Sequence, residues 1–349
     1  MTPHPRRFSV RLPRPLWFGL ATFVLVVVAI GLWFGVPAYR QHATIREIER
    51  LGGSVTTVPG RLEWLRDWVG DDRMASFDEP DLVDLSETRA DDAAVACLNG
   101  LSGPRALLLD NTPVTDAALV HLGARTGLEV LGLKQTQVTD DGLSFVKGMA
   151  ALAWLDLTGT RVTDVGVVDL QDLSRLEYLN LSGTRVTDAG LGHLKGLARL
   201  ESLLLAETQV HGTGFASCKG LTGLHTLALP GARLTDEGLE QVKGLTSLQN
   251  LDIRGTQVTD AGLAHVASLA CLQSLWLDNT QVTDGGLARL KGLTSLQSLH
   301  LNRTKVSGAG LSHLNGLAKL ESLWIYNTKV TDADVADLKH VLPSLMIHR

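Results

Sequence analysis

The chain has 349 residues and a formal net charge of −5, with 44% hydrophobic and 20% charged residues. Residues 1–50 hold seven Arg and two Glu, which leaves 25 basic and 35 acidic residues, a formal charge of −10, for the rest of the chain. This acidic balance argues against nucleic-acid binding by residues 51–349. Cys97, Cys218 and Cys271 are odd in number and unevenly spaced, so we expect free, buried thiols rather than disulfides or metal ligands.

The first 36 residues have the pattern of a membrane anchor. Residues 1–15 form a basic, Pro-rich tail. Leu16–Val36 contains no charged residue over 21 positions, which as a helix spans roughly 30 Å, the thickness of a bilayer core. Trp17-Phe18 and Trp33-Phe34 bracket it, where interfacial aromatic residues sit. We predict a transmembrane helix over residues 16–36.

The basic tail favours a cytoplasmic N-terminus, and hence a single-pass protein whose remainder is extracytoplasmic, in a periplasm or on the cell surface. The alternative is a cleaved signal peptide, because Val36-Pro37-Ala38 loosely resembles a small-residue cleavage site.

Residues 37–80 are predicted to form a juxtamembrane segment and the N-terminal cap of a repeat array that begins at residue 81. The spacing of Ile45, Ile48 and Leu51 predicts a short amphipathic helix that ends at Gly52-Gly53. Residues 54–58 suit a strand, and residues 61–69 a second short helix. Such a cap keeps the first repeat from exposing its core to water.

Residues 81–340 form a tandem array with a period of 24 residues. The same Thr recurs in ten units, and Ala232 takes its place in the remaining one, so there are eleven: Thr88, Thr112, Thr136, Thr160, Thr184, Thr208, Thr256, Thr280, Thr304 and Thr328. Leu176, Leu179, Leu181 and Thr184 follow the pattern Leu-x-x-Leu-x-Leu-x-x-Thr, which resembles the leucine-rich repeat. A fixed period predicts a solenoid in which each unit covers its neighbour's apolar face.

Each unit is predicted to hold one strand and one helix. The alternation in Leu179-Asn180-Leu181 places Leu inward and Asn180 outward. Thr187 is placed to cap a helix, Asp188 to complement its dipole, and Gly196 to end it in the left-handed conformation. The repeated Thr has a structural role, its hydroxyl bonding to the backbone of the turn. Residues 341–349 break the period and are predicted to form a C-terminal cap strand.

Four elements occur together in this chain: Ile-Arg-x-x-x-x-Leu-Gly-Gly at Ile45–Gly53, Trp-Leu-Arg-x-Trp-Val-Gly-Asp-Asp at Trp64–Asp72, Thr-x-Val-Thr-Asp-x-Gly-Leu units, and a Leu-Pro-x-x-x-Ile-His-Arg ending. On these, the chain resembles a bacterial family of membrane-anchored leucine-rich repeat proteins. The resemblance implies an α/β solenoid, a horseshoe with a parallel concave sheet and convex helices, preceded by one transmembrane helix. It also implies interaction with partners of unknown identity. The repeats are similar to those of internalins and of F-box proteins, but no F-box-like module precedes them.

The outward strand positions line the concave face and are not dictated by folding, so recognition is expected there. Neighbouring strands lie about 4.8 Å apart, which gives the last three units an aromatic column (Trp276, His300 and Trp324) beside a polar one (Asp278, Asn302 and Tyr326), with Asp252 just before. A smaller patch combines Trp154 and Tyr178 with Asp156. The alternative is that the two C-terminal Trp merely cover the end of the sheet under the cap.

Catalytic patterns are missing from the sequence: we find no nucleophile with a placed base and no metal-ligand spacing. We therefore predict no enzyme activity, no cofactor and no bound metal. The unit after Thr208 replaces the usual Thr-Asp with His211-Gly212, which predicts a bent or frayed turn rather than a nucleotide site.

The function that the sequence favours is a membrane-anchored module that binds a protein or peptide on the concave face. Two alternatives remain open. One is a structural envelope spacer or self-associating scaffold that uses its convex helices. The other is recognition of cell-wall glycans, because aromatic residues beside acids and amides suit sugars as well.

Overall fold

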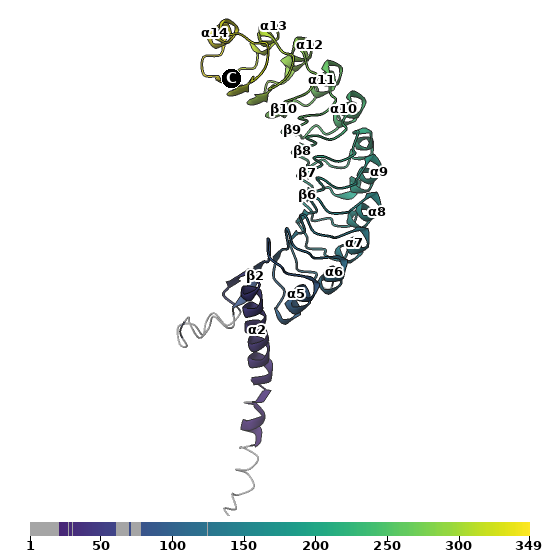
Figure 1. Ribbon diagram of the computed structural model, residues 1–349, viewed down its shortest axis with the longest axis vertical. Helices are drawn as coiled ribbons and strands as arrows, with labels where there is room; N and C mark the ends of the chain where they lie inside the picture. Colours follow the sequence, from purple (N-terminus) through teal and green to yellow (C-terminus); the bar gives the residue numbers. More distant parts are fainter. Residues whose placement is uncertain (1–20, 27, 30, 61–69, 71–77, 124) are drawn as a thin grey trace, which may run out of the picture.

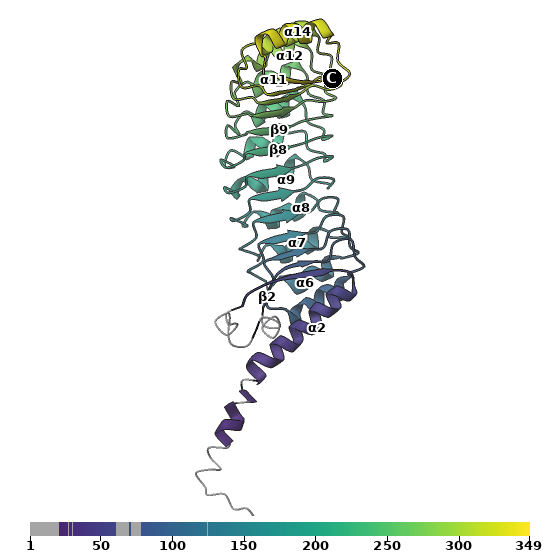
Figure 2. The same ribbon diagram turned by 90° about the vertical axis from the view of Figure 1, so that its left-hand side faces the viewer.

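The computed structural model describes residues 21–26, 28–29, 31–60, 70, 78–123 and 125–349. The repeats form a horseshoe with the strands on its inner, concave side and the helices on its outer, convex side (Figure 1). The same units are stacked along one axis in Figure 2. Thirteen strands follow one another in sequence order across a single sheet. The predicted α/β solenoid with a parallel concave sheet is confirmed.

The strands are short and in register. β1 pairs antiparallel with β2, and each later pair is parallel. Their bounds are β1 Ser54–Val58, β2 Glu79–Asp84, β3 Ala106–Leu108, β4 Val130–Gly132, β5 Trp154–Asp156, β6 Tyr178–Asn180, β7 Ser202–Leu204, β8 Thr226–Ala228, β9 Asn250–Asp252, β10 Ser274–Trp276, β11 Ser298–His300, β12 Ser322–Trp324 and β13 Met346–His348.

The convex side carries short α-helices, several of which continue as 3₁₀ turns. The α-helices are α2 Val36–Arg50, α5 Asp92–Cys97, α6 Asp116–Leu122, α7 Asp140–Val146, α8 Asp164–Val167, α9 Asp188–Leu191, α10 Asp236–Val242, α11 Asp260–Val266, α12 Asp284–Leu287, α13 Gly308–Leu311 and α14 Asp332–Val341. The other helical turns are η1 Gly31–Gly35, a π-helix, and η4 Leu98–Gly100, η5 Val168–Leu170, η6 Gly192–Gly196, η7 Thr213–Ser217, η8 Ala288–Gly292 and η9 Ser312–Leu314.

The core is one continuous cluster of leucines and valines. Leu179 and Leu181 are fully buried, as are their counterparts along the sheet. The repeated Thr is buried in eight of its ten units. The Thr184 hydroxyl donates to the Leu181 carbonyl at 2.6 Å, and the same bond recurs in the other Thr units. This confirms its predicted role in the turn.

The residue before the repeated Thr is left-handed in every unit. Gly159, Gly183, Gly231 and Gly255 take this position at φ of 66 to 70°, and the other seven units use a non-Gly residue at φ of 54 to 60°. Asn is tolerated in this region, whereas Arg303 at φ 56° is unusual. The predicted left-handed cap at Gly196 is wrong, because η6 ends there without a positive φ. The left-handed residue of each unit thus lies in the turn after the strand and not at the end of the helix.

A ladder of aspartates joins the helix starts of successive units. Asp164 Oδ1 accepts from the Thr187 backbone N–H at 2.8 Å, and Oδ2 accepts from the Thr187 hydroxyl at 2.6 Å. A Cβ added to Gly190 would come within 2.5 Å of Asp164 Oδ1. The Thr-Asp-x-Gly phrase therefore encodes contact between units, and the helix-dipole explanation of its Asp was incomplete.

The same two bonds recur along the array in seven pairs: Asp92–Thr115, Asp116–Thr139, Asp140–Thr163, Asp164–Thr187, Asp236–Thr259, Asp260–Thr283 and Asp284–Ser307. We call this set the Asp–Thr ladder.

The unit with His211-Gly212 interrupts the ladder without interrupting the sheet. Asp188 accepts instead from three backbone N–H groups, those of His211, Gly212 and Gly214, at 2.8 to 2.9 Å. Gly212 is left-handed at φ 97°, and the 3₁₀ helix η7 follows. The predicted irregularity in this unit is therefore a 3₁₀ helix in place of an α-helix. It does not disturb the sheet, because β7 and β8 pair without a register shift.

The N-terminal cap is built from α2 and β1. Ile48 and Thr44 of α2 are buried against the first unit, and the Thr44 hydroxyl donates to the Cys97 carbonyl at 3.4 Å. Helix α2 begins at Val36, nine residues before the first apolar residue that predicted it, and the chain turns at left-handed Gly52. The helix predicted over residues 61–69 lies outside the described residues.

At the other end, α14 extends to Val341, and the cap strand is limited to Met346–His348.

The described part of the structure does not support the predicted transmembrane helix over residues 16–36. Among the described residues, no helix has both the length and the apolar character that crossing a bilayer requires. Residues 21–26 and 28–29 of the predicted span are helical. Residues 1–20, 27 and 30 lie outside the described part of the chain.

The three cysteines are free thiols. Cys218 is buried at a position that carries Leu or Val in other units, and burial raises the pKa of its thiol to about 11. Cys97 and Cys271 are exposed, so the prediction of buried thiols is wrong for these two, which occupy helix-end and loop positions outside the repeated core.

Candidate functional site

The aromatic column predicted on the concave face is formed. Trp276, His300 and Trp324 occupy equivalent positions on β10, β11 and β12 and are register partners. The Trp276 and His300 ring centroids are 5.5 Å apart at 34°, and those of His300 and Trp324 are 5.2 Å apart at 9°. All three side chains are only partly buried. Neighbouring strands thus bring together residues 24 positions apart.

His348 is a fourth member that sequence reasoning missed. It is the register partner of Trp324 on the cap strand β13, and the two rings stack at 3.7 Å and 11°. The signal was present, because His348 lies one 24-residue period after Trp324. The cap therefore extends the column sideways and leaves the Trp rings accessible to solvent. We call Trp276, His300, Trp324 and His348 the aromatic ladder.

The polar column beside the aromatic ladder is tied together by backbone contacts. Asp278 Oδ1 accepts from the Asn302 backbone N–H at 2.8 Å, and Asn302 Oδ1 accepts from the Tyr326 backbone N–H at 2.7 Å. These bonds fix two side chains of the column before any ligand arrives. Tyr326 is 42% exposed, and its ring centroid lies 6.3 Å from that of Trp324.

A hollow of about 460 Å³ opens at this column. Its walls are polar and come from four successive units: Arg254, Asp278, Asn279, Asn302, Arg303, Tyr326 and Asn327. Asp252 contributes at its edge, since its carboxylate binds Arg254 through Nε at 2.9 Å and Nη2 at 2.6 Å. The hollow therefore offers amide, guanidinium, carboxylate and phenol groups within reach of one ligand.

His300 is the inner of the two histidines in the aromatic ladder and lies between two Trp rings. Burial between the Trp rings lowers its pKa below the usual 6.5, and Arg254 and His348 lower it further. Asp278, whose Oδ2 lies 4.0 Å from His300 Nδ1, and Asp252 oppose this shift. The neutral imidazole is thus favoured, which suits ring stacking.

The second predicted patch is also assembled. Trp154 on β5 and Tyr178 on β6 stack at 4.9 Å and 9°. Asp156 is only 7% exposed, and its Oδ1 accepts from the Thr158 backbone N–H at 2.8 Å. Asn180 Nδ2 lies 3.4 Å from both Asp156 Oδ2 and the Tyr178 hydroxyl. Burial raises the pKa of Tyr178, and the Asp156 charge adds to the rise.

Ring orientation is shared by both patches and limits what they can bind. Cross-strand stacking turns the ring faces toward one another along the solenoid axis, so the ring edges face the concave solvent. An aromatic edge is the positive end of the ring quadrupole and packs well against carbonyl groups and apolar side chains. A flat sugar ring needs an exposed aromatic face, which within these stacks is largely occupied.

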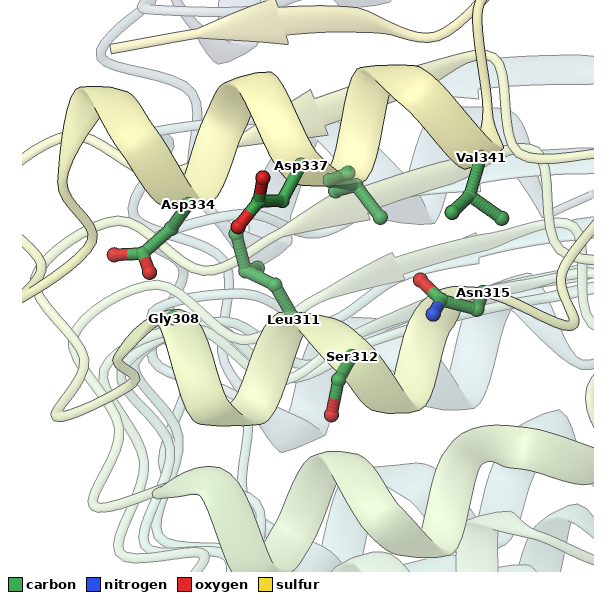
Figure 3. A pocket seen from close by; sticks show the side chains of 8 residues that line it. Gly308, Leu311, Ser312, Asn315, Asp334, Asp337 and Val341 are labelled. Carbon is green, nitrogen blue, oxygen red and sulfur yellow. The ribbon is translucent and has the colours of Figure 1, made fainter.

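A separate cavity lies between the last repeat and the C-terminal cap helix. It measures about 230 Å³ and lies between α13 with η9 and α14, as Figure 3 shows. Gly308 stands where most units carry the ladder Asp, and Asp334 of α14 leans toward it. Asp334 Oδ2 instead accepts from the Thr331 backbone N–H at 2.8 Å. The cavity thus marks the end of the Asp–Thr ladder.

Comparison with known families supports the repeat assignment. Sequence profiles described as leucine rich repeat match residues 150–210 and 244–267. The strands and helices of the structure continue the same 24-residue unit on both sides of these segments. The chain therefore has the solenoid fold of leucine-rich repeats, and these two segments match that repeat in sequence. The comparison with curated proteins found no match.

Solved structures show the same fold at low sequence identity. An internalin of Listeria monocytogenes has a TM-score of 0.51 at 21% identity and covers 73% of this chain and 82% of its own. A leucine-rich repeat protein of Leptospira interrogans has a TM-score of 0.50 at 19% identity and covers 73% and 74%. The ectodomain of the Arabidopsis receptor kinase HAESA has a TM-score of 0.56 at 20% identity and covers 82% of this chain and 49% of its own.

Proposed function

We propose that this protein is a membrane-anchored interaction module that binds a protein or peptide on its concave face. The observation that carries the proposal is the aromatic ladder, partly exposed beside a polar hollow of about 460 Å³. Clustered Trp and Tyr next to Arg are typical anchors of protein interfaces. Nothing in the repeat requires aromatic residues at these positions, since other units carry Leu204 or Ala228 there.

Ring geometry favours a peptide over a glycan. The edges of the aromatic ladder suit backbone carbonyls and aliphatic side chains, and the amides of Asn302 and Asn327 suit a peptide backbone. HAESA, which shares the fold, has been crystallised with a peptide hormone ligand. A solenoid of this kind can therefore hold a peptide. Glycan recognition is a weaker alternative, because stacked rings offer few free faces.

The anchor in this proposal is the apolar segment Leu16–Val36. Its described residues include Phe23, Leu25 and Trp33, whose side chains are exposed in the isolated chain and would be covered by lipid. Helix α2 continues from this segment and packs on the first unit, so the solenoid would be held close to the membrane. With a basic tail on the cytoplasmic side, the solenoid is extracytoplasmic.

The test is partner capture from native membranes by the full chain and by Trp324→Ala and Tyr326→Ala variants. Loss of a buried aromatic anchor costs about 2 kcal/mol or more of binding free energy, or roughly 30-fold in affinity. Val165→Ala is the matched control, because Val165 is 70% exposed on the convex helix α8. Thermal unfolding of each variant separates loss of contact from loss of fold. Unchanged capture by folded ladder variants would refute the concave site, and loss only in convex variants would favour the scaffold alternative.

A further inference from the structure

The polar hollow lies alongside the aromatic ladder and not beyond its end. The ladder residues are the last residues of β10 to β13. Two residues after the ends of β9 to β12 stand four wall residues of the hollow: Arg254, Asp278, Asn302 and Tyr326. At about 3.3 Å per extended residue, this wall is roughly 7 Å from the aromatic ladder. A peptide that follows the ladder can therefore reach into the hollow with a side chain.

The outer edge of the hollow is formed by the left-handed residues of three successive units. Asn279, Arg303 and Asn327 have φ of 54 to 56°, are exposed and line the hollow. Asn often adopts this conformation, so the turn itself accounts for the two Asn but not for Arg303. The other units carry Gly, Asn, Gln or Glu at this position. The fold therefore does not require a base here.

The other charged groups of the hollow already have partners. Arg254 donates to the Asp252 carboxylate through Nε and Nη2. These hydrogen bonds raise the pKa of Arg254, and the charges of Asp252 and Asp278 add to the rise. Asp278 Oδ1 also accepts from a backbone N–H at 2.8 Å. Arg303, by contrast, has no ion pair and no side-chain hydrogen bond to any described residue. Its guanidinium is the unpaired charge of this hollow.

Two amides flank this free guanidinium. The side chains of Asn279 and Asn327 likewise make no hydrogen bond within the part of the chain that the structure describes. Neighbouring units are about 4.8 Å apart, so the two amides lie within roughly 10 Å of each other with Arg303 between them. A carboxylate is acceptor-only, and its two oxygens suit a guanidinium and an amide N–H together. A basic ligand would be repelled at the same place.

We propose that the hollow is a subsite for an acidic side chain, Asp or Glu, of the partner peptide. This rests on the proposed function and gives its partner a chemistry: a peptide that lies along the edges of the aromatic ladder and directs one carboxylate sideways. The carboxylate accepts from the Arg303 guanidinium and from the Asn279 or Asn327 amide. A side chain is favoured over the C-terminal carboxylate of a peptide, because the hollow lies beside the aromatic ladder.

The experiment uses the full chain in detergent, labelled with 3-fluorotyrosine and observed by fluorine NMR. The sequence has three Tyr, and the Tyr326 resonance is assigned by its disappearance in Tyr326→Phe. The probes are N-acetyl-Ala-Glu-Ala-amide and N-acetyl-Ala-Gln-Ala-amide, which keeps the shape and removes the charge. We expect a saturable shift at Tyr326 with the Glu peptide, at least about fivefold weaker binding of the Gln peptide, and no shift at Tyr39 or Tyr178.

A third probe separates the two sources of a carboxylate. N-acetyl-Ala-Ala-Ala with a free C-terminus carries its charge on the chain end. We expect it to bind more weakly than the Glu peptide. Tighter binding would mean that the hollow takes a chain end, and the assignment to a side chain would be overturned.

Two variants remove the charge in different ways. Arg303→Gly suits the left-handed turn, so it is expected to unfold no earlier than wild type, and Arg303→Gln keeps most of the side chain. Each should reduce the preference for Glu over Gln to about onefold. Asn111→Gly is the matched control, because Asn111 occupies the same turn at φ 56° far from the hollow, and it should leave the preference unchanged. Equal binding of both peptides to wild type, or a preference that survives in both Arg303 variants, overturns the subsite.

The outcome is distinguishable from a failure of the proposed function. If Trp324→Ala captures the partner normally while the hollow still prefers the Glu peptide, the role of the aromatic ladder fails and the subsite stands. If capture depends on Trp324 but the Glu and Gln peptides bind alike, the subsite alone is wrong.

Discussion

Two columns of side chains follow the solenoid, each with one position in a unit; the Asp–Thr ladder is interrupted at His211-Gly212 and ends at Asp284–Ser307. The Asp–Thr ladder on the helix side is nearly uniform, and both oxygens of each Asp are paired inside the protein. The outward column on the sheet changes from Asp84 to Trp324 and leaves its rings partly exposed. A column whose residue hardly changes and whose hydrogen bonds are all made within the protein has a structural role. A column whose residues vary and whose side chains are partly exposed is suited to recognition.

The largest expected difference between a core position and a concave-face position is found for two neighbouring residues of β11. Leu299 points inward and is fully buried, whereas His300 points outward in the aromatic ladder. We expect Leu299→Ala to lower the free energy of unfolding by about 2–5 kcal/mol, because it leaves a cavity in the core. His300→Ala should cost less, about 0.5–1.5 kcal/mol, which is the value of an aromatic ring contact. Urea unfolding measures both, and similar costs would mean that the column is part of the scaffold.

A second pair tests the Asp–Thr ladder itself. Asp140 and Asp141 both lie in the first turn of α7, but only Asp140 bonds to the next unit, at 2.7 Å to both the N–H and the hydroxyl of Thr163. Asp140→Ala leaves a partly buried N–H unpaired, at a cost of about 1–3 kcal/mol. Asp141→Ala removes only a dipole contact, worth about 0.3–1 kcal/mol. If both variants lost the same unfolding free energy, the bonds from Asp140 to Thr163 would add nothing beyond the interaction of an Asp with the helix dipole.

The third and smallest effect concerns pH. The folded protein holds the pKa of His300 below the usual 6.5, because burial between the Trp rings disfavours the charged form. The unfolded chain therefore binds the proton first, and this contribution to stability is full above pH 6.5 and is lost as pH falls through the lowered pKa. The urea midpoint of wild type should fall over this range more steeply than that of His300→Gln. Parallel curves would exclude His300 as the cause.

Most of the fold was predictable because a 24-residue period and two alternating leucines fix strand, turn and helix in every unit. The positions facing outward, Trp276, Trp324 and Trp154, follow from the same alternation. His348 could have been found by adding one more period. Bonds between units, such as Asp164 to Thr187, could not, because they depend on how far one unit is rotated on the next. The left-handed residue after each strand was missed for a different reason: Asn, Gln, Glu, Arg and Gly all occupy that position, so no single residue type marks it.

The central claim is that recognition takes place on the concave side of the C-terminal units. A photoreactive benzoylphenylalanine placed at Tyr326, on this face, and separately at Val165, on the convex face, tests it in native membranes. Both side chains are exposed, at 42% and 70%, so neither replacement disturbs the core. The account predicts a crosslink from position 326 to a different protein and little from position 165. Crosslinks confined to position 165, or only between copies of this chain, would contradict it.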